Sequence, residues 1–273
     1  MKHGWFPHWL LVYGWALCVS AGEWGPPQDV SFVARSDGST QHYVLLLPVG
    51  FRADQPHHLL VALHGHGSDR WQYIKQARDE CRIARDVAAE HQMVLVSPDY
   101  RAKTSWMGPK AEGDLVQILD ELKARFRIGK VFLCGGSMGG SSALTFAALH
   151  PELLHGVISM NGTANHLEYE GFQEAIRESF GGPKAQIPEE YKRRSAEYWP
   201  ERLRMPVGIT AGGKDKLVPP ESVVRLANVL KKIGGTVLLV YREAGGHSTN
   251  YEDGKAALEF VIQKAGEGRR TKE

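Results

Sequence analysis

The sequence contains few cysteines, little net charge and no long hydrophobic run after its first two dozen residues. Three cysteines in 273 residues cannot build a disulfide scaffold, so a hydrophobic core must hold the fold together. A formal net charge of +2, with Lys and Arg scattered along the chain, gives no sign of a nucleic-acid partner. No segment repeats and none has low complexity. The 42% hydrophobic and 23% charged residues are typical of a globular protein.

The first two dozen residues are typical of a secretory signal. Lys2 supplies a positive start, an apolar run covers residues 9–19, and small residues precede a cleavage point after Ala21. The run is too short to cross a membrane comfortably, although an uncleaved N-terminal anchor is an alternative. We therefore predict a signal peptide over residues 1–21, a secreted or periplasmic protein, and no stable insertion into a membrane.

Removal of this signal would leave two cysteines, Cys81 and Cys134. Cys134 ends a predicted buried strand, and Cys81 lies in a predicted helix. Two reduced and buried thiols are the simpler interpretation, because unpaired cysteine behaves as a small hydrophobic residue. A disulfide between them is the alternative.

Strand-like and helix-like patterns alternate along the rest of the chain. Continuous apolar runs such as His58–Leu63 predict buried strands, and amphipathic stretches such as residues 115–126 predict helices. This alternation predicts an α/β fold in which a mostly parallel sheet has helices on both faces. We place one domain at residues 28–266 and a flexible tail at 267–273. The other predicted strands are 30–34, 43–47, 93–97, 130–134, 154–160, 206–211 and 236–241, with the first two antiparallel. The other predicted helices are 71–90, 140–149, 220–233 and 252–264.

One segment, between about Asn165 and Glu201, interrupts the alternation. It predicts no strand, only polar helix-like sequence that carries several aromatic side chains: Tyr169, Phe172, Phe180, Tyr191, Tyr198 and Trp199. We predict either a lid or small helical cap inserted after the sixth strand, or an ordinary pair of connecting helices.

The strongest chemical signal is the run Gly135-Gly136-Ser137-Met138-Gly139, between a predicted strand and a predicted helix. A G-x-S-x-G match is common by chance, but a strand–turn–helix corner is the context in which it presents a nucleophile. Such a turn strains the serine backbone, and side chains at Gly135 and Gly139 would collide with it. The serine oxygen then lies at a helix N-terminus, where N–H groups favour negative charge. Ser137 is therefore the candidate nucleophile.

A serine hydroxyl becomes a good nucleophile only when a base takes its proton and an acid orients that base. Asp215 follows the predicted strand 206–211, and His247 follows the last predicted strand. Both would lie on loops at the carboxyl edge of the sheet, where ligands bind in open α/β folds. The order of these residues along the chain, serine, then acid, then histidine, is also the order expected when the serine lies on such a strand–turn–helix corner. We predict a catalytic triad of Ser137, Asp215 and His247.

Catalysis of this kind also needs two donors for an oxyanion. We assign one to the backbone N–H of Met138 and the other to that of His66, in the loop His64-Gly65-His66-Gly67 after a predicted strand. The His-x-His spacing also fits a zinc site, but no third ligand is evident and side chains on a tight turn diverge. We expect neither a metal ion nor another cofactor.

These motifs resemble the α/β-hydrolase superfamily over about residues 30–265. The matching positions are the loop 64–67, the run 135–140, Gly212-Gly213-Lys214-Asp215 with Val218-Pro219, and Gly246-His247. Within the superfamily, the chain is similar to secreted esterases of the feruloyl-esterase and polyhydroxyalkanoate-depolymerase type, and to prolyl-oligopeptidase-like catalytic domains. The resemblance implies an α/β-hydrolase fold and ester hydrolysis through an acyl-enzyme. Prolyl oligopeptidases also carry a large N-terminal propeller, which nothing in this sequence could form, and this argues against exopeptidase activity.

We expect three residues near the substrate pocket. Trp71 follows the oxyanion loop, Trp106 follows the strand 93–97, and Asn161 begins the segment that leads to the possible cap. An aromatic lining would suit a phenolic or aliphatic acyl ester. Tryptophans near helix starts are also common as packing residues, so that alternative stays open.

The sequence thus predicts a secreted hydrolase of carboxylic esters, acting on a small-molecule or polymer-linked ester. A peptidase that cleaves short peptides with the same triad is one alternative. It would need a charged clamp for the peptide terminus, and the sequence identifies none. A non-catalytic binding protein of the same fold is the other alternative. The oligomeric state is not indicated by the sequence.

Overall fold

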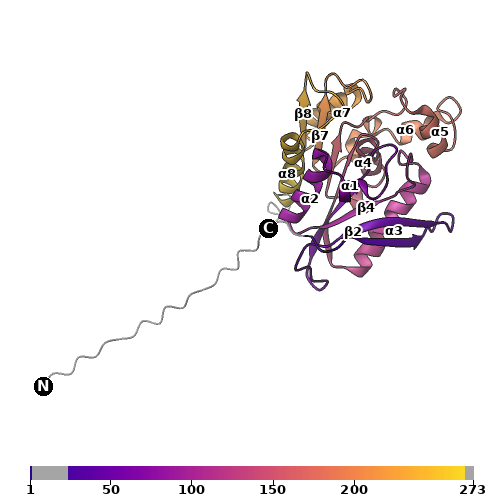
Figure 1. The fold of residues 1–273 in the computed structure, drawn as a ribbon. Coiled ribbons are helices and arrows are strands. Elements are labelled where there is room, and N and C mark those ends of the chain that lie inside the picture. Colours follow the sequence, from indigo (N-terminus) through magenta and orange to yellow (C-terminus); the bar gives the residue numbers. More distant parts are fainter. Residues whose placement is uncertain (2–23, 268–273) are drawn as a thin grey trace.

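The computed structural model describes Met1 and residues 24–267 (Figure 1). Apart from Met1, the predicted signal segment lies outside the described residues, and so does the predicted tail apart from Glu267. Within the part that the structure describes, no helix is both long enough and apolar enough to cross a bilayer.

The strands form one eight-stranded sheet in the order β1-β2-β4-β3-β5-β6-β7-β8. Strand β2 pairs antiparallel with β1 and β4, and all other neighbours are parallel. The predicted α/β fold with a mostly parallel sheet and two antiparallel first strands is therefore confirmed. The bounds are β1 (Gln28–Val33), β2 (Thr40–Leu46), β3 (His57–Leu63), β4 (Val94–Pro98), β5 (Ile128–Gly136), β6 (Gly156–Met160), β7 (Val207–Gly212) and β8 (Val237–Arg242).

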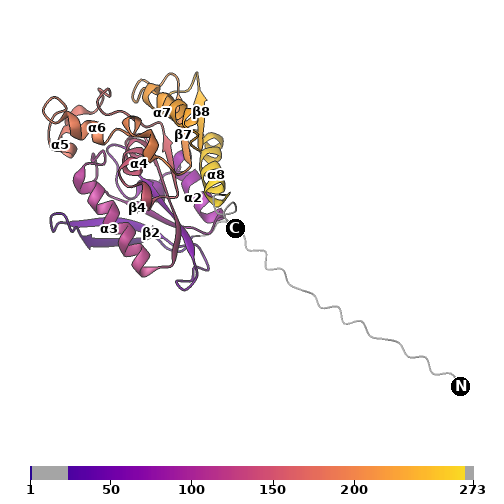
Figure 2. The ribbon, with the colours of Figure 1, turned by 180° about the vertical axis from the view of Figure 1, so that it is seen from behind.

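Helices cover both faces of this sheet (Figures 1 and 2). Alternate residues of a strand point to opposite faces, and in β3 Leu60 and Ala62 face one layer while Leu59 and Val61 face the other. The first layer contains α2 (Asp79–Glu90) and α8 (Tyr251–Glu267), which pack against each other. The second layer contains α3 (Pro109–Arg125), α4 (Met138–Leu149) and α7 (Glu221–Lys232).

One predicted helix, over residues 71–90, is broken in the structure. It is divided into α1 (Gln72–Lys75) and α2, because Gln76 and Arg78 adopt extended backbone angles with ψ of 142° and 144°. The guanidinium of Arg85 stabilises this break by donating hydrogen bonds to the carbonyls of Tyr73 and Gln76, at 2.6 and 2.9 Å. The helical periodicity of the sequence could not predict this break, because the hydrogen bonds that stabilise it come from a residue in the following helix.

The segment predicted to lack strands, between β6 and β7, is helical. It contains α5 (Gln173–Phe180), α6 (Pro188–Arg193) and two short 3-10 helices at 196–198 and 200–202. Helices α5 and α6 lie together at one corner of the molecule, far from α8 (Figures 1 and 2). We call residues 165–201 the cap segment.

A fully buried arginine, Arg194, ties the cap segment to the second helical layer. Its guanidinium donates to Glu112 of α3 at 2.8 Å, to Glu190 at 2.6 Å and to the carbonyl of Met107 at 2.6 Å. Such full pairing is needed because an unpaired buried charge is costly. The cap segment is therefore packed into the core rather than resting on its surface.

The cysteines of the described residues, Cys81 in α2 and Cys134 in β5, are both free and buried. Both side chains belong to the hydrophobic core between the sheet and the layer of α2 and α8. Burial raises the pKa of the Cys81 thiol to about 11, which disfavours the reactive thiolate. The structure thus agrees with the simpler interpretation of two reduced thiols.

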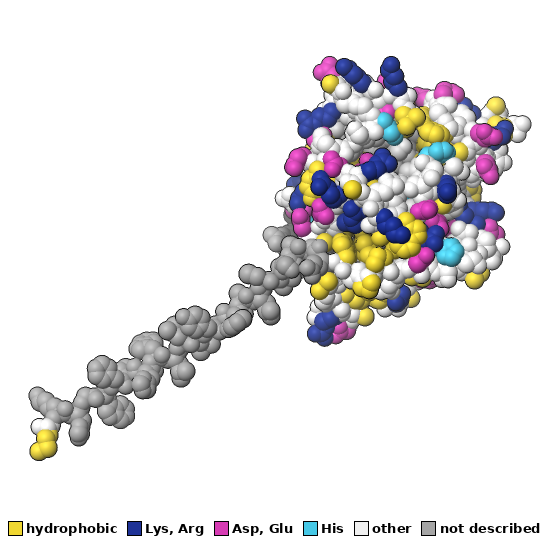
Figure 3. Space-filling model, viewed as in Figure 1, with side chains coloured by type: hydrophobic (Ala, Val, Ile, Leu, Met, Phe, Trp, Pro, Cys, Tyr) yellow, Lys and Arg dark blue, Asp and Glu magenta, His cyan; other side chains and the backbone are white. Residues whose placement is uncertain are grey.

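The surface has no dominant charge sign on the face shown in Figure 3. Side chains of Lys, Arg, Asp and Glu are interspersed there, and histidine side chains lie beside a hydrophobic patch in its upper half. This mixture agrees with the small net charge of +2.

Candidate active site

Ser137 lies on the tight turn between β5 and α4. Its φ of 57° and ψ of −121° are angles that residues other than glycine rarely adopt. A Cβ atom on Gly139 would lie 2.0 Å from the carbonyl oxygen of Leu63, and one on Gly135 would lie 2.4 Å from that of Gly139. Close backbone packing therefore requires glycine at both positions, as the sequence predicts.

The three predicted triad residues form a continuous hydrogen-bonded chain. Nε2 of His247 lies 2.9 Å from Oγ of Ser137, and Nδ1 of His247 lies 2.7 Å from Oδ2 of Asp215. When Nδ1–H donates to the carboxylate, Nε2 is left to accept the serine proton. This arrangement can support nucleophilic attack by the serine oxygen.

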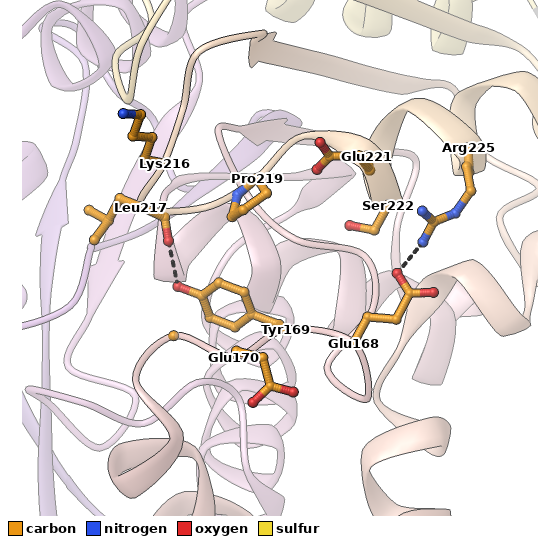
Figure 4. A pocket seen from close by; sticks show the side chains of 10 residues that line it. Glu168, Tyr169, Glu170, Lys216, Leu217, Pro219, Glu221, Ser222 and Arg225 are labelled. Carbon is orange, nitrogen blue, oxygen red and sulfur yellow. Dashed lines mark hydrogen bonds and ion pairs between the residues drawn. The ribbon is translucent and has the colours of Figure 1, made fainter.

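Backbone N–H groups hold the Asp215 carboxylate in place. Asp215 is buried, and its Oδ1 accepts hydrogen bonds from the N–H groups of Leu217 and Val218, both at 2.9 Å. The hydroxyl of Tyr169, in the cap segment, donates to the carbonyl of Leu217 at 3.0 Å (Figure 4). The cap segment is thus connected to the loop that orients Asp215, a link that sequence reasoning missed.

The predicted oxyanion donors have free N–H groups. Met138 begins α4, and the first N–H groups of a helix have no acceptor within it. The N–H of His66 also has no acceptor among the described residues, whereas those of Gly65 and Gly67 are bonded. A Cβ atom on Gly65 would lie only 3.9 Å from Cβ of Ser137, so this loop passes close to the serine. Free donors beside a serine are what an oxyanion hole requires.

Two buried side chains hold the oxyanion loop. Oε1 of Gln72 accepts the N–H of Gly65 at 2.9 Å, and the hydroxyl of Tyr100 donates to the carbonyl of His64 at 2.6 Å. Both side chains are almost fully buried. The loop is therefore fixed before any ligand binds, which is the preorganisation that electrostatic catalysis needs.

The two histidines of this loop have separate partners. The ring nitrogens of His64 lie 2.9 and 3.1 Å from the carbonyls of Gly65 and Asp99. Nδ1 of His66 accepts the indole N–H of Trp106 at 3.2 Å, and burial lowers the pKa of the His66 ring. Across Met1 and residues 24–267, no group of three or more His, Cys, Asp or Glu side chains is placed to hold a metal ion.

A cavity of about 380 Å³ opens over Ser137 and His247. One part of its lining is polar and comes from α1, α2 and the break between them: Gln72, Gln76, Arg78 and Glu80. Another part is apolar, with Phe172 from the cap segment and Leu217 from the Asp215 loop. A second hollow, of about 410 Å³, shares Leu217 with this cavity and lies between the cap segment and α7 (Figure 4).

The three predicted pocket residues do not line the cavity over Ser137. The ring of Trp71 is covered by Lys75, whose Nζ lies 3.9 Å from the ring centroid. Trp106 is fully buried, 5.5 Å from the ring of Phe172. Asn161 is buried against Thr249, at 3.0 Å. The prediction that these three residues line the substrate pocket is therefore corrected for this cavity. Trp106 packs behind the cavity wall, against Phe172. The sequence could not show this, because the position of a residue near a strand end does not determine where its side chain points.

Two charged lining residues, Arg78 and Glu80, were not identified from the sequence. Glu80 is 7% exposed, and its Oε1 lies 2.9 Å from the guanidinium of Arg78. Burial raises the pKa of Glu80, while the positive charge of Arg78 opposes this rise. In the sequence, Glu80 falls inside the predicted helix 71–90, where a charged side chain is expected to face solvent, so no signal marked it as part of a cavity.

The fold and the site define a serine hydrolase of the α/β-hydrolase superfamily. Residues 101–266, more than half of the chain, match the sequence profile of the prolyl oligopeptidase family. The chain therefore belongs to the prolyl oligopeptidase family. A search of curated proteins found no significant match.

Solved structures of several hydrolases are similar to this fold. A ferulic acid esterase matches with a TM-score of 0.67 and 17% identity, over 88% of this chain and 98% of the esterase. A fluorophosphonate-binding serine hydrolase of Staphylococcus aureus matches with a TM-score of 0.65 and 19% identity, over 88% and 98%. An acylaminoacyl peptidase of Pyrococcus horikoshii matches with a TM-score of 0.67 and 15% identity, over 90% of this chain but only 43% of the peptidase. At these identities the likeness establishes the fold.

Proposed function

We propose that the protein hydrolyses carboxylic esters, with Ser137 as its nucleophile. The hydrogen-bonded chain from Ser137 through His247 to Asp215, at 2.9 and 2.7 Å, carries this proposal. Oγ of Ser137 attacks the acyl carbon while Nε2 of His247 takes its proton. Asp215 keeps the imidazole in the correct orientation and stabilises the imidazolium that forms.

The backbone N–H groups of His66 and Met138 stabilise the oxyanion of the tetrahedral intermediate. His247 then returns the proton to the leaving alcohol, and the acyl group remains on Ser137. A water molecule that His247 activates attacks this acyl-enzyme, releases the carboxylic acid and restores the serine. Every step uses protein groups and water.

A peptidase that acts on short peptides is the second candidate. The specific observation in its favour is the ion pair of Arg78 and Glu80 in the cavity over Ser137, since a charged pair can bind a peptide terminus. Ester cleavage stays the first candidate because an alkoxide leaves more readily than an amine and needs less assistance from the site.

The test is the hydrolysis of p-nitrophenyl butyrate and of alanine p-nitroanilide by the wild-type protein and by Ser137→Ala. We expect ester turnover to fall by a factor of roughly 10⁴ or more in the variant, as in other serine hydrolases. Ser31→Ala, on the exposed surface of β1, is the matched control. Normal turnover by a folded Ser137→Ala protein would rule out this mechanism, and cleavage of the anilide alone would favour the peptidase.

We also propose that residues 1–21 direct export and that the mature chain begins near Gly22. Expression of the full chain in a bacterium, with N-terminal sequencing of the periplasmic fraction, tests this. An intact N-terminus in the cytoplasmic or membrane fraction would contradict it.

A further inference from the structure

Glu80 is the most deeply placed charge in the lining of the cavity over Ser137. Its side chain is 9% exposed, whereas the Arg78 side chain that neutralises it is 55% exposed. Ion pairs with an exposed partner are weak, so another cation that reaches the carboxylate can replace the guanidinium. The replacement must be a cation, because a buried carboxylate without a partner is costly.

Glu80 also lies beside a buried hydroxyl that has no hydrogen-bond partner among the described residues. The hydroxyl of Tyr73 is fully buried, and no residue in the described part of the chain forms a hydrogen bond with it. A Cβ atom built on Gly136 would lie 3.4 Å from Oε1 of Glu80 and 3.5 Å from the Tyr73 hydroxyl. Both oxygens therefore face the residue that precedes Ser137. A buried polar group without a partner is unusual and calls for a ligand or an ordered water.

The position of Glu80 indicates which half of an ester it would contact. Helix α2 packs against α8, which follows the His247 loop, and Oδ2 of Asp79 accepts the N–H of Tyr251 at 3.1 Å. Glu80 and His247 also line the same cavity over Ser137. Because His247 delivers its proton to the leaving group, we place the leaving alcohol on the side of the cavity that Glu80 lines. Phe172 and Leu217, on the cap side, are left for the acyl chain.

We propose that Glu80 is a specificity residue that binds a protonated amine on the leaving alcohol, so that the preferred substrates are esters of amino alcohols. This inference rests on the proposed ester hydrolysis. The ammonium group displaces Arg78 and donates a charge-assisted hydrogen bond to the Glu80 carboxylate. A hydrogen bond of this kind should make kcat/KM for the cationic ester roughly 10- to 100-fold higher than kcat/KM for an ester whose leaving group has the same shape but no charge.

The experiment compares three butyrate esters of similar size. Dimethylaminoethyl butyrate carries a cation, isoamyl butyrate has the same shape without charge, and carboxyethyl butyrate carries an anion. The wild-type protein should prefer the cationic ester, and Glu80→Gln should reduce the ratio of cationic to neutral kcat/KM by roughly 10-fold or more. Glu90→Gln is the matched control, because Glu90 ends the same helix and pairs with Lys255 outside the cavity. It should leave the ratio unchanged.

Equal use of the cationic and neutral esters would overturn the proposal, and so would a preference for the anionic ester, which would assign recognition to Arg78. A ratio that Glu80→Gln leaves unchanged would overturn it as well. These outcomes leave the hydrolysis of esters by Ser137 intact.

A binding measurement separates the inference from the proposed function. The Ser137→Ala protein should bind dimethylaminoethyl butyrate roughly 10-fold or more tightly than isoamyl butyrate in calorimetry, and the added Glu80→Gln change should abolish this difference. If no ester is cleaved, the proposed function fails, yet this measurement still decides whether Glu80 binds a cation. Equal binding of the two esters would overturn the inference by itself.

Discussion

The two sides of the cavity over Ser137 are built on opposite layers of the fold. The side next to α1 and α2 is polar, and it includes a buried carboxylate, Glu80, whose only ion-pair partner among the described residues is the exposed Arg78. The cap side is apolar, and the ring of Phe172 is packed 4.2 Å from that of His66. Behind the polar side, the buried hydroxyl of Tyr73 has no hydrogen-bond partner among the described residues, whereas the cap side is closely packed. The difference indicates that recognition of charge and recognition of the acyl chain are separate properties.

The largest effect should come from a residue that belongs to neither side. Asp215→Asn should lower kcat by roughly 10⁴-fold, because an amide no longer holds His247 in the productive tautomer. The cationic and neutral butyrates should be affected equally, since the hydrogen bonds of the Asp215 carboxylate to described residues go to His247 and to its own loop. Steady-state kinetics with both esters checks this, with the exposed Asp120→Asn as control. A loss confined to one ester would show that the two sides are not independent of the triad.

A smaller effect should appear on the polar side as the pH is lowered. Burial raises the pKa of Glu80 above its ordinary value of 4.5, and the charge of Arg78, 2.9 Å away, opposes this rise. Asp79 precedes Glu80 in α2, the hydroxyl of Tyr73 lies against the same residue, Gly136, and His247 lines the same cavity. The carboxylate is charged above this pKa and neutral below it. The preference for the cationic ester should therefore be complete above the pKa and decrease by roughly 10-fold or more as the pH falls through it.

The ratio of kcat/KM for the two esters isolates this effect, because a loss of catalysis that is common to both esters cancels in the ratio. Glu80→Gln should abolish the pH dependence of the ratio. A ratio that stays constant with pH in the wild-type protein would mean that Glu80 does not interact with the leaving group.

The smallest effect should come from the cap side. Phe172→Ala removes a partly buried ring from the cavity and should raise the relative kcat/KM for octanoate over butyrate p-nitrophenyl esters, by up to about 10-fold. The ratio of cationic to neutral butyrates should not change. Tyr198→Ala, an exposed aromatic of the cap segment outside this cavity, is the control. A change in the charge preference would contradict the separation of the two sides.

Much of the sheet could be predicted from the sequence, because apolar runs and turns are local signals. The residues from Leu59 to Leu63 are all apolar since both faces of this part of β3 are buried. The break between α1 and α2 was missed because its support, the guanidinium of Arg85, comes from the next helix. The start of α3 at Pro109 was also missed, although proline is favoured in the first turn of a helix.

Trp106 and Glu80 show why the pocket was harder to predict than the triad. Trp106 lies in the expected loop, but its indole donates to His66 and packs under Phe172, away from the cavity. Glu80 lies in the interior of the predicted helix 71–90, yet the break before α2 makes it part of a helix start and brings it against Gly136. In both cases the direction of the side chain depends on a contact between distant parts of the chain.

The sequence by itself determined the components of the chemistry. A glycine-flanked serine between a strand and a helix, with an acid and a histidine after later strands, is a set of local patterns whose order along the chain is informative. Only the tertiary structure decided the surroundings of Ser137: an apolar cap side, a polar side with Glu80, and a Trp106 that supports rather than lines the cavity. The physical reason is that strand ends meet wherever the sheet forms, whereas cavity walls arise from packing between segments that are distant in sequence.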